Sequence, residues 1–198
     1  MWTRIAIGAV LVAALPGSTV LSAQTSEHRS QVVLYGTGGG VSPVTDLNAA
    51  GTASLKTGWS AGGGIGIQLH RNVALRGTFD FAQAKGEGSA AGNLLGRKLN
   101  QYFIGGDVQL RYPTESGIAP YLFVGAGAVY LDSNLSGYDS FTKFAGKGGL
   151  GVEYLIPRTN VGIFAQGTSY LYKYDRNGFD KNQVDILWSG GLSYRLPF

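Results

Sequence analysis

The sequence contains no cysteine, and only 14% of its 198 residues are charged, against about 25% in ordinary soluble domains. Without cysteine, no disulfide framework, thiolate metal site or cysteine nucleophile can form. The net charge is a mild +4, and the basic residues are scattered rather than clustered in runs. This pattern gives no support for nucleic-acid binding.

Long apolar runs are also missing after the first 23 residues. The best stretch there, residues 118–131, is shorter than the roughly 20 residues that a transmembrane helix needs. Residues 1–23 combine Arg4, the apolar run 5–15, a Pro16-Gly17 break and the small residue Ala23, which is typical of a signal peptide cleaved after Ala23. We therefore predict a signal peptide over 1–23 and a short periplasmic segment over 24–30.

Glycine is abundant, with 32 residues, and apolar and polar residues alternate with period two along most of the chain. This period predicts strands with one apolar and one mostly polar face. Val73 and Leu75, for example, share one face of a strand, while Arg76 lies on the other. In the first, fifth and seventh strands the facing is ambiguous. Strands are predicted at 31–41, 57–69, 73–85, 98–112, 119–132, 143–156, 161–174 and 183–198.

The connections between these strands alternate in length. The long ones are 42–56, 86–97, 133–142 and 175–182, and the short ones are 70–72, 113–118 and 157–160. Such alternation is typical of an antiparallel meander with long loops at one end and tight turns at the other. The predicted fold class is all-β, an eight-stranded antiparallel up-and-down barrel over residues 31–198.

Two kinds of barrel fit this pattern. A soluble lipocalin-like barrel turns its apolar face inward, whereas a transmembrane barrel turns it toward lipid and encloses a polar lumen. Glycine and serine accompany the charges on the polar faces, which favours a crowded lumen filled by side chains. Five positive and four negative charges nearly balance, as buried charges must. The predicted lumen charge network comprises Arg76, Asp80, Asp107, Arg111, Lys143, Lys147, Glu153, Asp185 and Arg195.

Aromatic residues favour the transmembrane alternative, because they concentrate toward both ends of the strands. One group lies near the long connections: Trp59, Phe81, Tyr102, Phe144, Tyr170, Tyr172 and Tyr174. The other lies near the short ones: Tyr112, Tyr121, Tyr154, Tyr194 and Phe198. Two aromatic belts around an aliphatic band match the two interfaces of a membrane. As the aromatic girdle we predict Trp59, Tyr102, Tyr112, Tyr154 and Trp188.

Three stretches carry a family resemblance: PYLFVGAGAVY at 120–130, GGLGVEY at 148–154 and GLSYRLPF at 191–198. On these the chain resembles the small outer-membrane β-barrel family of Gram-negative bacteria, with its OmpA-type and OmpX-type barrels and opacity-type porins. The resemblance covers the chain after residue 23. It implies a place in the cell outer membrane after export, among outer-membrane lipid and lipopolysaccharide. The alternating residues Leu192, Tyr194, Leu196 and Phe198 resemble the signal read by the barrel assembly machinery, which is then an expected partner.

The sequence offers no catalytic, metal or cofactor site. His28 precedes the barrel and His70 lies in a short turn, so a histidine-activated nucleophile at the rim is not available. We expect a non-enzymatic outer-membrane protein with a structural or surface-interaction role carried by four extracellular loops. Apolar loop residues that are candidates for contacting a surface ligand are Leu94, Leu95, Tyr138, Phe141 and Phe179. The alternatives are a narrow porin-like channel for small solutes and a soluble, lipocalin-like periplasmic lipid carrier.

Overall fold

The computed structural model describes residues 31–45, 54–87, 98–133, 140–174 and 181–196. They form eight strands: β1 (Gln31–Pro43), β2 (Ser54–His70), β3 (Val73–Glu87), β4 (Lys98–Arg111), β5 (Ile118–Ser133), β6 (Phe141–Leu155), β7 (Val161–Tyr174) and β8 (Lys181–Arg195). Among these residues, no helix is long and apolar enough to cross a membrane.

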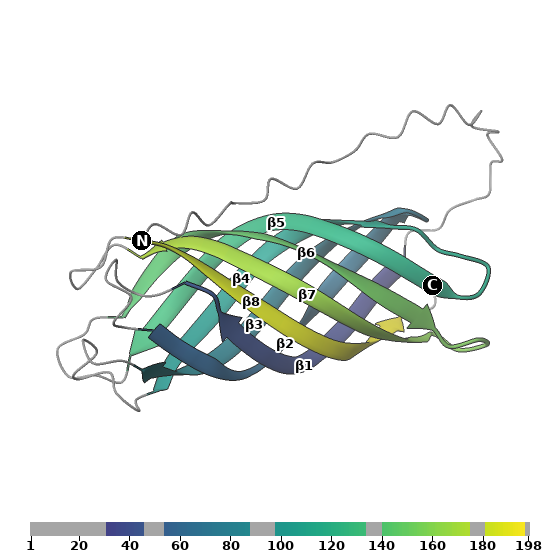
Figure 1. Cartoon of the computed structure of the whole chain (residues 1–198). Helices are drawn as coiled ribbons and strands as arrows, with labels where there is room; N and C mark the ends of the chain where they lie inside the picture. Colours follow the sequence, from purple (N-terminus) through teal and green to yellow (C-terminus); the bar gives the residue numbers. More distant parts are fainter. Residues whose placement is uncertain (1–30, 46–53, 88–97, 134–139, 175–180, 197–198) are drawn as a thin grey trace, which may run out of the picture.

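The strands close into one barrel (Figure 1). Each strand pairs antiparallel with the next, and β1 also pairs antiparallel with β8, so that Gly38 has Ala61 on one side and Gly190 on the other. Closure leaves no open sheet edge, which would otherwise be a template for pairing with other chains. The predicted eight-stranded antiparallel up-and-down barrel is confirmed.

Strand boundaries agree with the predicted ranges to within a few residues, and the last strand shows the most instructive difference. It was predicted to reach residue 198, whereas β8 is assigned to Arg195, and residues 197–198 lie outside the described residues. The Leu196 N–H still donates to the Val32 carbonyl at 2.9 Å.

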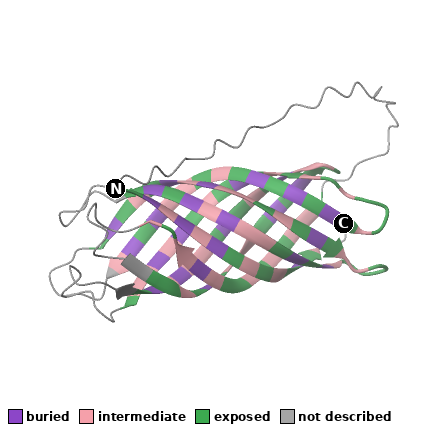
Figure 2. Cartoon of the chain, in the orientation of Figure 1, coloured by how far each residue is buried: buried purple, intermediate pink, exposed green. Residues whose placement is uncertain are grey.

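Burial alternates along the strands, as the checkered colouring of Figure 2 shows, because successive side chains of a strand point to opposite faces of the sheet. The structure settles the facing of the three strands that the sequence left ambiguous. In β1 the Leu34 side chain faces outward, in β5 Phe123 faces inward and Val124 outward, and in β7 Phe164 faces inward and Ile163 outward.

The outer wall of the barrel is apolar. Ile104, Val124 and Leu150 are 64%, 64% and 70% exposed, and many other large apolar side chains share this surface. A soluble monomer rarely shows so extended an apolar surface, whereas lipid requires one. A soluble lipid carrier would have the opposite arrangement, with its apolar face inward.

The lumen is less uniformly polar than predicted. Its half near the long connections holds an apolar cluster: Val41, Ala82, Ala84, Phe103, Val129, Leu131, Phe141, Ala145, Tyr170, Tyr172 and Leu187. Tyr170 and Tyr172, expected in the aromatic belt near the long connections, are buried here because β7 turns Ser169 and Leu171 outward instead. Tyr121 is likewise inside the barrel.

Phe141 was expected in a loop, but it is the first residue of β6 and is buried in the lumen. The other four apolar loop candidates lie outside the described residues: Leu94, Leu95, Tyr138 and Phe179. The Tyr174 side chain and Phe198 are likewise outside the described part.

Inward glycines create the space for large lumen side chains. A Cβ at Gly149 would lie 2.5 Å from Cζ of Phe123, and one at Gly151 would lie 2.5 Å from Cζ of Tyr121. Both distances are far below van der Waals contact, so an aromatic ring from β5 occupies the place of a side chain on β6. Outward Gly38, in contrast, has no atom within 4 Å of its virtual Cβ.

We expect Gly149→Val to destabilise the barrel by about 1–3 kcal/mol, the usual cost of overpacking a filled interior. Gly38→Ala is the matched control and should leave stability nearly unchanged. Urea unfolding of the refolded protein in lipid vesicles measures both. Equal stability of Gly149→Val and wild type would contradict the packing described for this part of the lumen.

Candidate functional site

Two ion-paired groups occupy the lumen, and the first lies at its centre. Arg76 and Asp107 are direct register partners on β3 and β4, and Arg76 Nε lies 2.6 Å from Asp107 Oδ1. Lys147 Nζ, from β6, lies 3.0 Å from Asp107 Oδ2 and 3.9 Å from Asp80 Oδ2, and it donates to the Thr78 hydroxyl at 3.0 Å. The Asp107 side chain is fully buried, and among the described residues these two cations neutralise its charge.

The second group lies toward the short turns. Glu153 of β6 accepts through Oε2 from the guanidinium of Arg111 and, at 3.0 Å, from that of Arg195. Its Oε1 accepts from the Ser193 hydroxyl at 2.6 Å. Arg111 Nη1 also donates to the Gln68 amide oxygen at 3.4 Å. One carboxylate therefore joins β4, β6 and β8 across the lumen.

The remaining two predicted lumen charges lie outside these groups, nearer the long connections. Asp185 is 1% exposed and accepts from the Tyr172 hydroxyl at 2.8 Å; within the described ranges no cation is paired with it. Lys143 Nζ lies 5.9 Å from the centroid of the Phe141 ring. The structure thus brings seven of the nine predicted charges together in ion pairs and places these two elsewhere.

Aromatic side chains around Arg76 were not predicted as part of this network. The Arg76 guanidinium carbon lies 4.5 Å from the ring centroid of Phe123, 5.6 Å from that of Tyr35 and 5.8 Å from that of Tyr121. All three come from β1 or β5, where the alternation is ambiguous in the sequence. A signal was present in Gly149 and Gly151, whose missing side chains make room for two of these rings.

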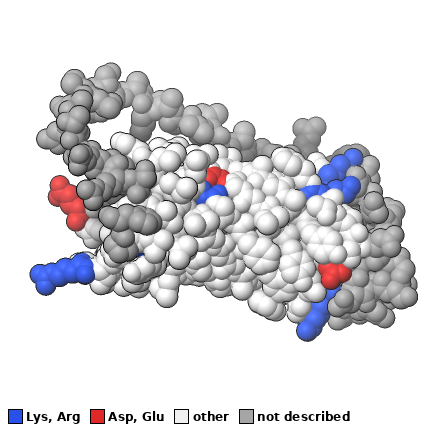
Figure 3. Space-filling model, turned by 180° about the vertical axis from the view of Figure 1, so that it is seen from behind, with Lys and Arg blue, Asp and Glu red and all other residues white. Residues whose placement is uncertain are grey.

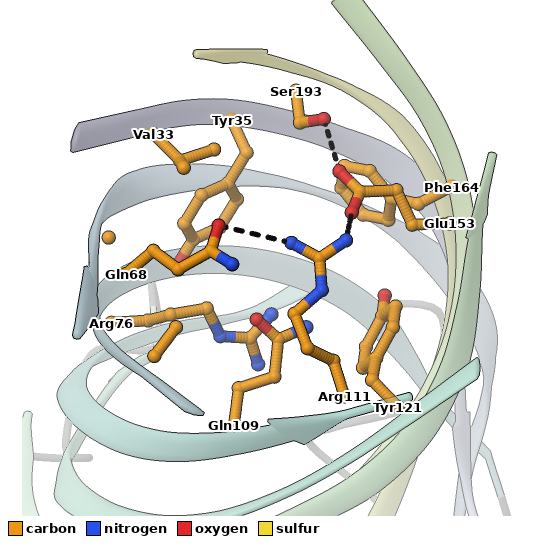
Figure 4. A pocket seen from close by; sticks show the side chains of 12 residues that line it. Val33, Tyr35, Gln68, Arg76, Gln109, Arg111, Tyr121, Glu153, Phe164 and Ser193 are labelled. Carbon is orange, nitrogen blue, oxygen red and sulfur yellow. Dashed lines mark hydrogen bonds and ion pairs between the residues drawn. The ribbon is translucent and has the colours of Figure 1, made fainter. Parts of the chain in front are cut away.

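A cavity of about 40 Å³ lies beside both groups, at the short-turn end of the lumen (Figure 4). Its lining combines polar, aromatic and small apolar residues from all eight strands: Val33, Tyr35, Gly66, Gln68, Ala74, Arg76, Gln109, Arg111, Tyr121, Glu153, Phe164 and Ser193. Figure 4 shows the guanidinium groups of Arg76 and Arg111 in the middle of this ring of side chains.

The profile of the family described as "Outer membrane protein beta-barrel domain" matches residues 10–195. The chain belongs to this outer-membrane β-barrel family. Its setting is therefore the outer membrane of Gram-negative bacteria, and the apolar wall faces lipid. No curated protein sequence matches the chain.

Solved outer-membrane barrels share its fold. Neisserial surface protein A is 16% identical in sequence and superposes with a TM-score of 0.62. The alignment covers 85% of this chain and 100% of the Neisserial protein. AlkL is 17% identical and superposes with a TM-score of 0.54, and the alignment covers 86% of this chain and 92% of AlkL. OprG from Pseudomonas aeruginosa is 16% identical and superposes with a TM-score of 0.51, and the alignment covers 85% of this chain and 97% of OprG. At these identities the likeness concerns the fold alone.

On the lipid side of this outer-membrane barrel, four aromatic rings form a continuous belt near the long connections. The ring centroids of Trp59 and Phe81 are 5.0 Å apart, those of Phe81 and Tyr102 are 5.0 Å apart, and those of Tyr102 and Tyr130 are 6.0 Å apart. Such a belt suits a membrane interface. Two predicted girdle residues, Trp59 and Tyr102, thus both contact Phe81.

The other predicted girdle residues lie elsewhere. Tyr112 and Tyr154 are 71% and 41% exposed near the short turns. Trp188 is also exposed, but it is the eighth of fifteen residues in β8 and so lies midway along the strand, away from both ends.

The C-terminal residues of the predicted assembly signal point mostly toward lipid. Leu192 and Tyr194 are exposed on the wall, and Leu196 follows the end of β8. Phe198 lies outside the described residues. Their role in assembly stays a prediction.

Three lysines on adjacent strands form a row beyond the aromatic belt. Lys85 has Lys56 as its register partner on one side and Lys98 on the other, and all three are exposed. A β-bulge between Lys56 and Trp59 shifts the register, which brings Lys56 onto the same face as Lys85. Between this row and the belt, the Gln83 amide donates to Asn100 at 2.8 Å. We call Lys56, Lys85 and Lys98 the lysine row.

Charged side chains on the face seen in Figure 3 gather mainly toward the two ends of the barrel, with a largely uncharged wall between them. This distribution fits a protein whose middle lies in hydrocarbon. Within the described ranges, no group of three or more His, Asp or Glu side chains is placed to hold a metal ion.

Removing the shared carboxylate of the central group tests the lumen network. We expect Asp107→Ala to cost about 3–5 kcal/mol of unfolding free energy, because it leaves two buried cations without their main partner. Asp132→Ala is the control; Asp132 lies near the rim and accepts one hydrogen bond, from Ser140, so its loss should cost about 1 kcal/mol or less. Urea unfolding in vesicles compares them, and similar losses in the two variants would argue against a tightly coupled network.

Proposed function

We propose that this protein is a non-enzymatic integral outer-membrane barrel with a structural role, and that its surface interactions are carried by the four long connections outside the cell. The observation that carries the proposal is the filled lumen. The ion pairs of Arg76, Asp107 and Lys147 occupy its centre, and the apolar cluster around Phe103 and Leu131 fills the half nearest the long connections. An eight-stranded barrel packed in this way leaves its loops and wall as the surfaces for interaction.

A narrow channel for small solutes is the second candidate. The cavity of about 40 Å³ at the short-turn end favours it, since it provides space for small polar species inside the lumen. A continuous path would still have to pass the fully buried Asp107 and the apolar cluster beyond it. Displacing these side chains requires breaking buried ion pairs, which costs several kcal/mol.

Planar-bilayer recording distinguishes the two candidates. We expect the folded wild-type barrel to show no sustained conductance, because its lumen is plugged by side chains. Heat-modifiable migration on a gel establishes that the inserted protein is folded, and a large porin in the same bilayers serves as the positive control. Steady, reproducible channels from folded protein would favour the solute channel over the structural role.

Export and assembly complete the proposal. Residues 1–23 have the composition of a signal peptide, so the protein recovered from the outer membrane should begin at Gln24, as N-terminal sequencing would reveal. The alternating Leu192, Tyr194, Leu196 and Phe198 are proposed to guide the barrel assembly machinery. A Phe198-deleted chain that reaches the outer membrane in wild-type amounts would argue against that role.

We further propose that the lysine row binds the phosphate groups of lipopolysaccharide. Like charges placed directly across strands repel each other, so an anion beside Lys85 and Lys98 is favourable. The row lies beyond the belt of Trp59, Phe81 and Tyr102, at the level where headgroup phosphates meet a membrane protein. Charge and position therefore favour a phosphorylated glycolipid of the outer leaflet.

Replacing Lys56, Lys85 and Lys98 together by Gln should weaken binding to lipopolysaccharide vesicles by about 3 kcal/mol, on the order of 100-fold, at about 1 kcal/mol per lysine. Vesicles of phosphatidylcholine, a lipid without net charge, provide the comparison. The double variant Arg71→Gln, Arg158→Gln removes exposed charge from the short turns and should leave the affinity unchanged. Equal losses in both sets of variants would show that net charge, rather than the lysine row, governs binding.

A further inference from the structure

The cavity at the short-turn end is lined by two buried guanidinium groups whose hydrogen-bonding capacity is incompletely used. The side chains of Arg76 and Arg111 are each only 8% exposed. Arg76 Nη2 and Arg111 Nε have no hydrogen-bond partner among the described residues. We propose that this cavity is a binding site for a small monovalent anion of the halide class, such as chloride.

The charges around the cavity have the sign that such a site requires. In the central group, the two cations Arg76 and Lys147 are matched by the two carboxylates of Asp80 and Asp107. In the group nearer the short turns, Arg111 and Arg195 share the carboxylate of Glu153, which among the described residues leaves an excess of one positive charge. An unbalanced buried charge is costly, and one monovalent anion balances it.

Glu153 also lines the cavity, but its carboxylate is already engaged. Oε2 accepts from Arg111 and Arg195, and Oε1 accepts from Ser193. Its negative charge is therefore offset by two guanidinium groups that surround it. The side of the cavity facing Arg76 has positive charge and free N–H groups, which suit an anion and repel a cation.

The uncharged lining includes a further donor. Gln109 lines the cavity, and its side-chain amide can donate two hydrogen bonds. The hydroxyls of Tyr35 and Tyr121 already donate, to the Gly77 carbonyl at 3.1 Å and to the Gln166 amide oxygen at 3.1 Å. The donors assigned to the anion are therefore Arg76 Nη2, Arg111 Nε and the Gln109 amide.

The size of the cavity restricts the ligand. Its volume of about 40 Å³ corresponds to roughly three water-sized particles. A halide ion with one or two waters fits this space, which is too small for a bulky organic solute. This assignment goes beyond the proposed function and does not depend on it, because a plugged structural barrel and a channel would both contain the cavity.

Bromide provides a direct test on the full-length wild-type barrel. Crystals grown in sodium bromide should give an anomalous scattering peak inside the cavity, within hydrogen-bonding distance of Arg76 and Arg111. A cavity that shows only water at saturating bromide would overturn the proposal.

Variants test the same assignment in solution. In this experiment chloride replaces gluconate at constant ionic strength. If chloride binds only the folded barrel, the urea concentration at the unfolding midpoint should rise with chloride concentration and then level off. Arg111→Gln removes the excess charge and should abolish this dependence. Lys143→Gln is the matched control, since it removes one lumen-facing cation that does not line the cavity, and it should retain the wild-type dependence.

Gln109→Leu keeps every charge and ion pair and so is expected to fold even if Arg111→Gln does not. It should raise the chloride Kd about tenfold through loss of one donor to a charged group. Equal chloride dependence in wild type and Gln109→Leu would remove Gln109 from the site. Equal dependence in wild type and Arg111→Gln, or in chloride and gluconate, would overturn the anion site itself.

Discussion

In a lipid environment every backbone N–H and C=O group needs a partner within the protein, and the pairing of β1 with β8 meets this requirement for the whole sheet. An open eight-stranded sheet would leave two edges unpaired in hydrocarbon. The sorting of side chains follows from closure, because alternate residues of every strand must then point either to lipid or into a narrow lumen.

The narrow lumen imposes its own constraint on packing. Large rings such as Phe123 and Tyr121 fit only because the facing positions on β6 are glycines. Charges that enter this interior have to be paired, and the structure pairs them mainly in its centre and toward the short turns. The half nearest the long connections holds Asp185 and Lys143 but is otherwise mainly apolar, so the lumen combines an ion-paired part with a part that resembles a soluble protein core.

The outer wall is layered to match the membrane. An aliphatic band is followed by the aromatic belt, then by the Gln83–Asn100 amide pair and finally by the lysine row. Each layer becomes more polar in the direction of the long connections, as an interface requires. The filled lumen and the graded wall are thus two consequences of the same closed sheet.

The eight strands and their positions were predictable from the sequence, because period-two alternation and turn residues are local properties. It also identified the polar face in β3, β4, β6 and β8, where charged residues alternate with bulky apolar ones. In β5 and β7 both faces carry apolar or small residues, because rings such as Phe123 and Tyr170 face the lumen. The sequence pattern of these two strands therefore does not indicate which face points inward.

The partners of each lumen charge were decided only by the tertiary structure. Lys147 reaches Asp107 across the intervening β5, and Glu153 reaches Arg195 across β7. The β-bulge beside Trp59 likewise determines which face Lys56 occupies. The physical reason is common to these cases: contacts across a closed barrel depend on its circumference and register, which involve all eight strands at once, whereas a sequence pattern reports only one strand at a time.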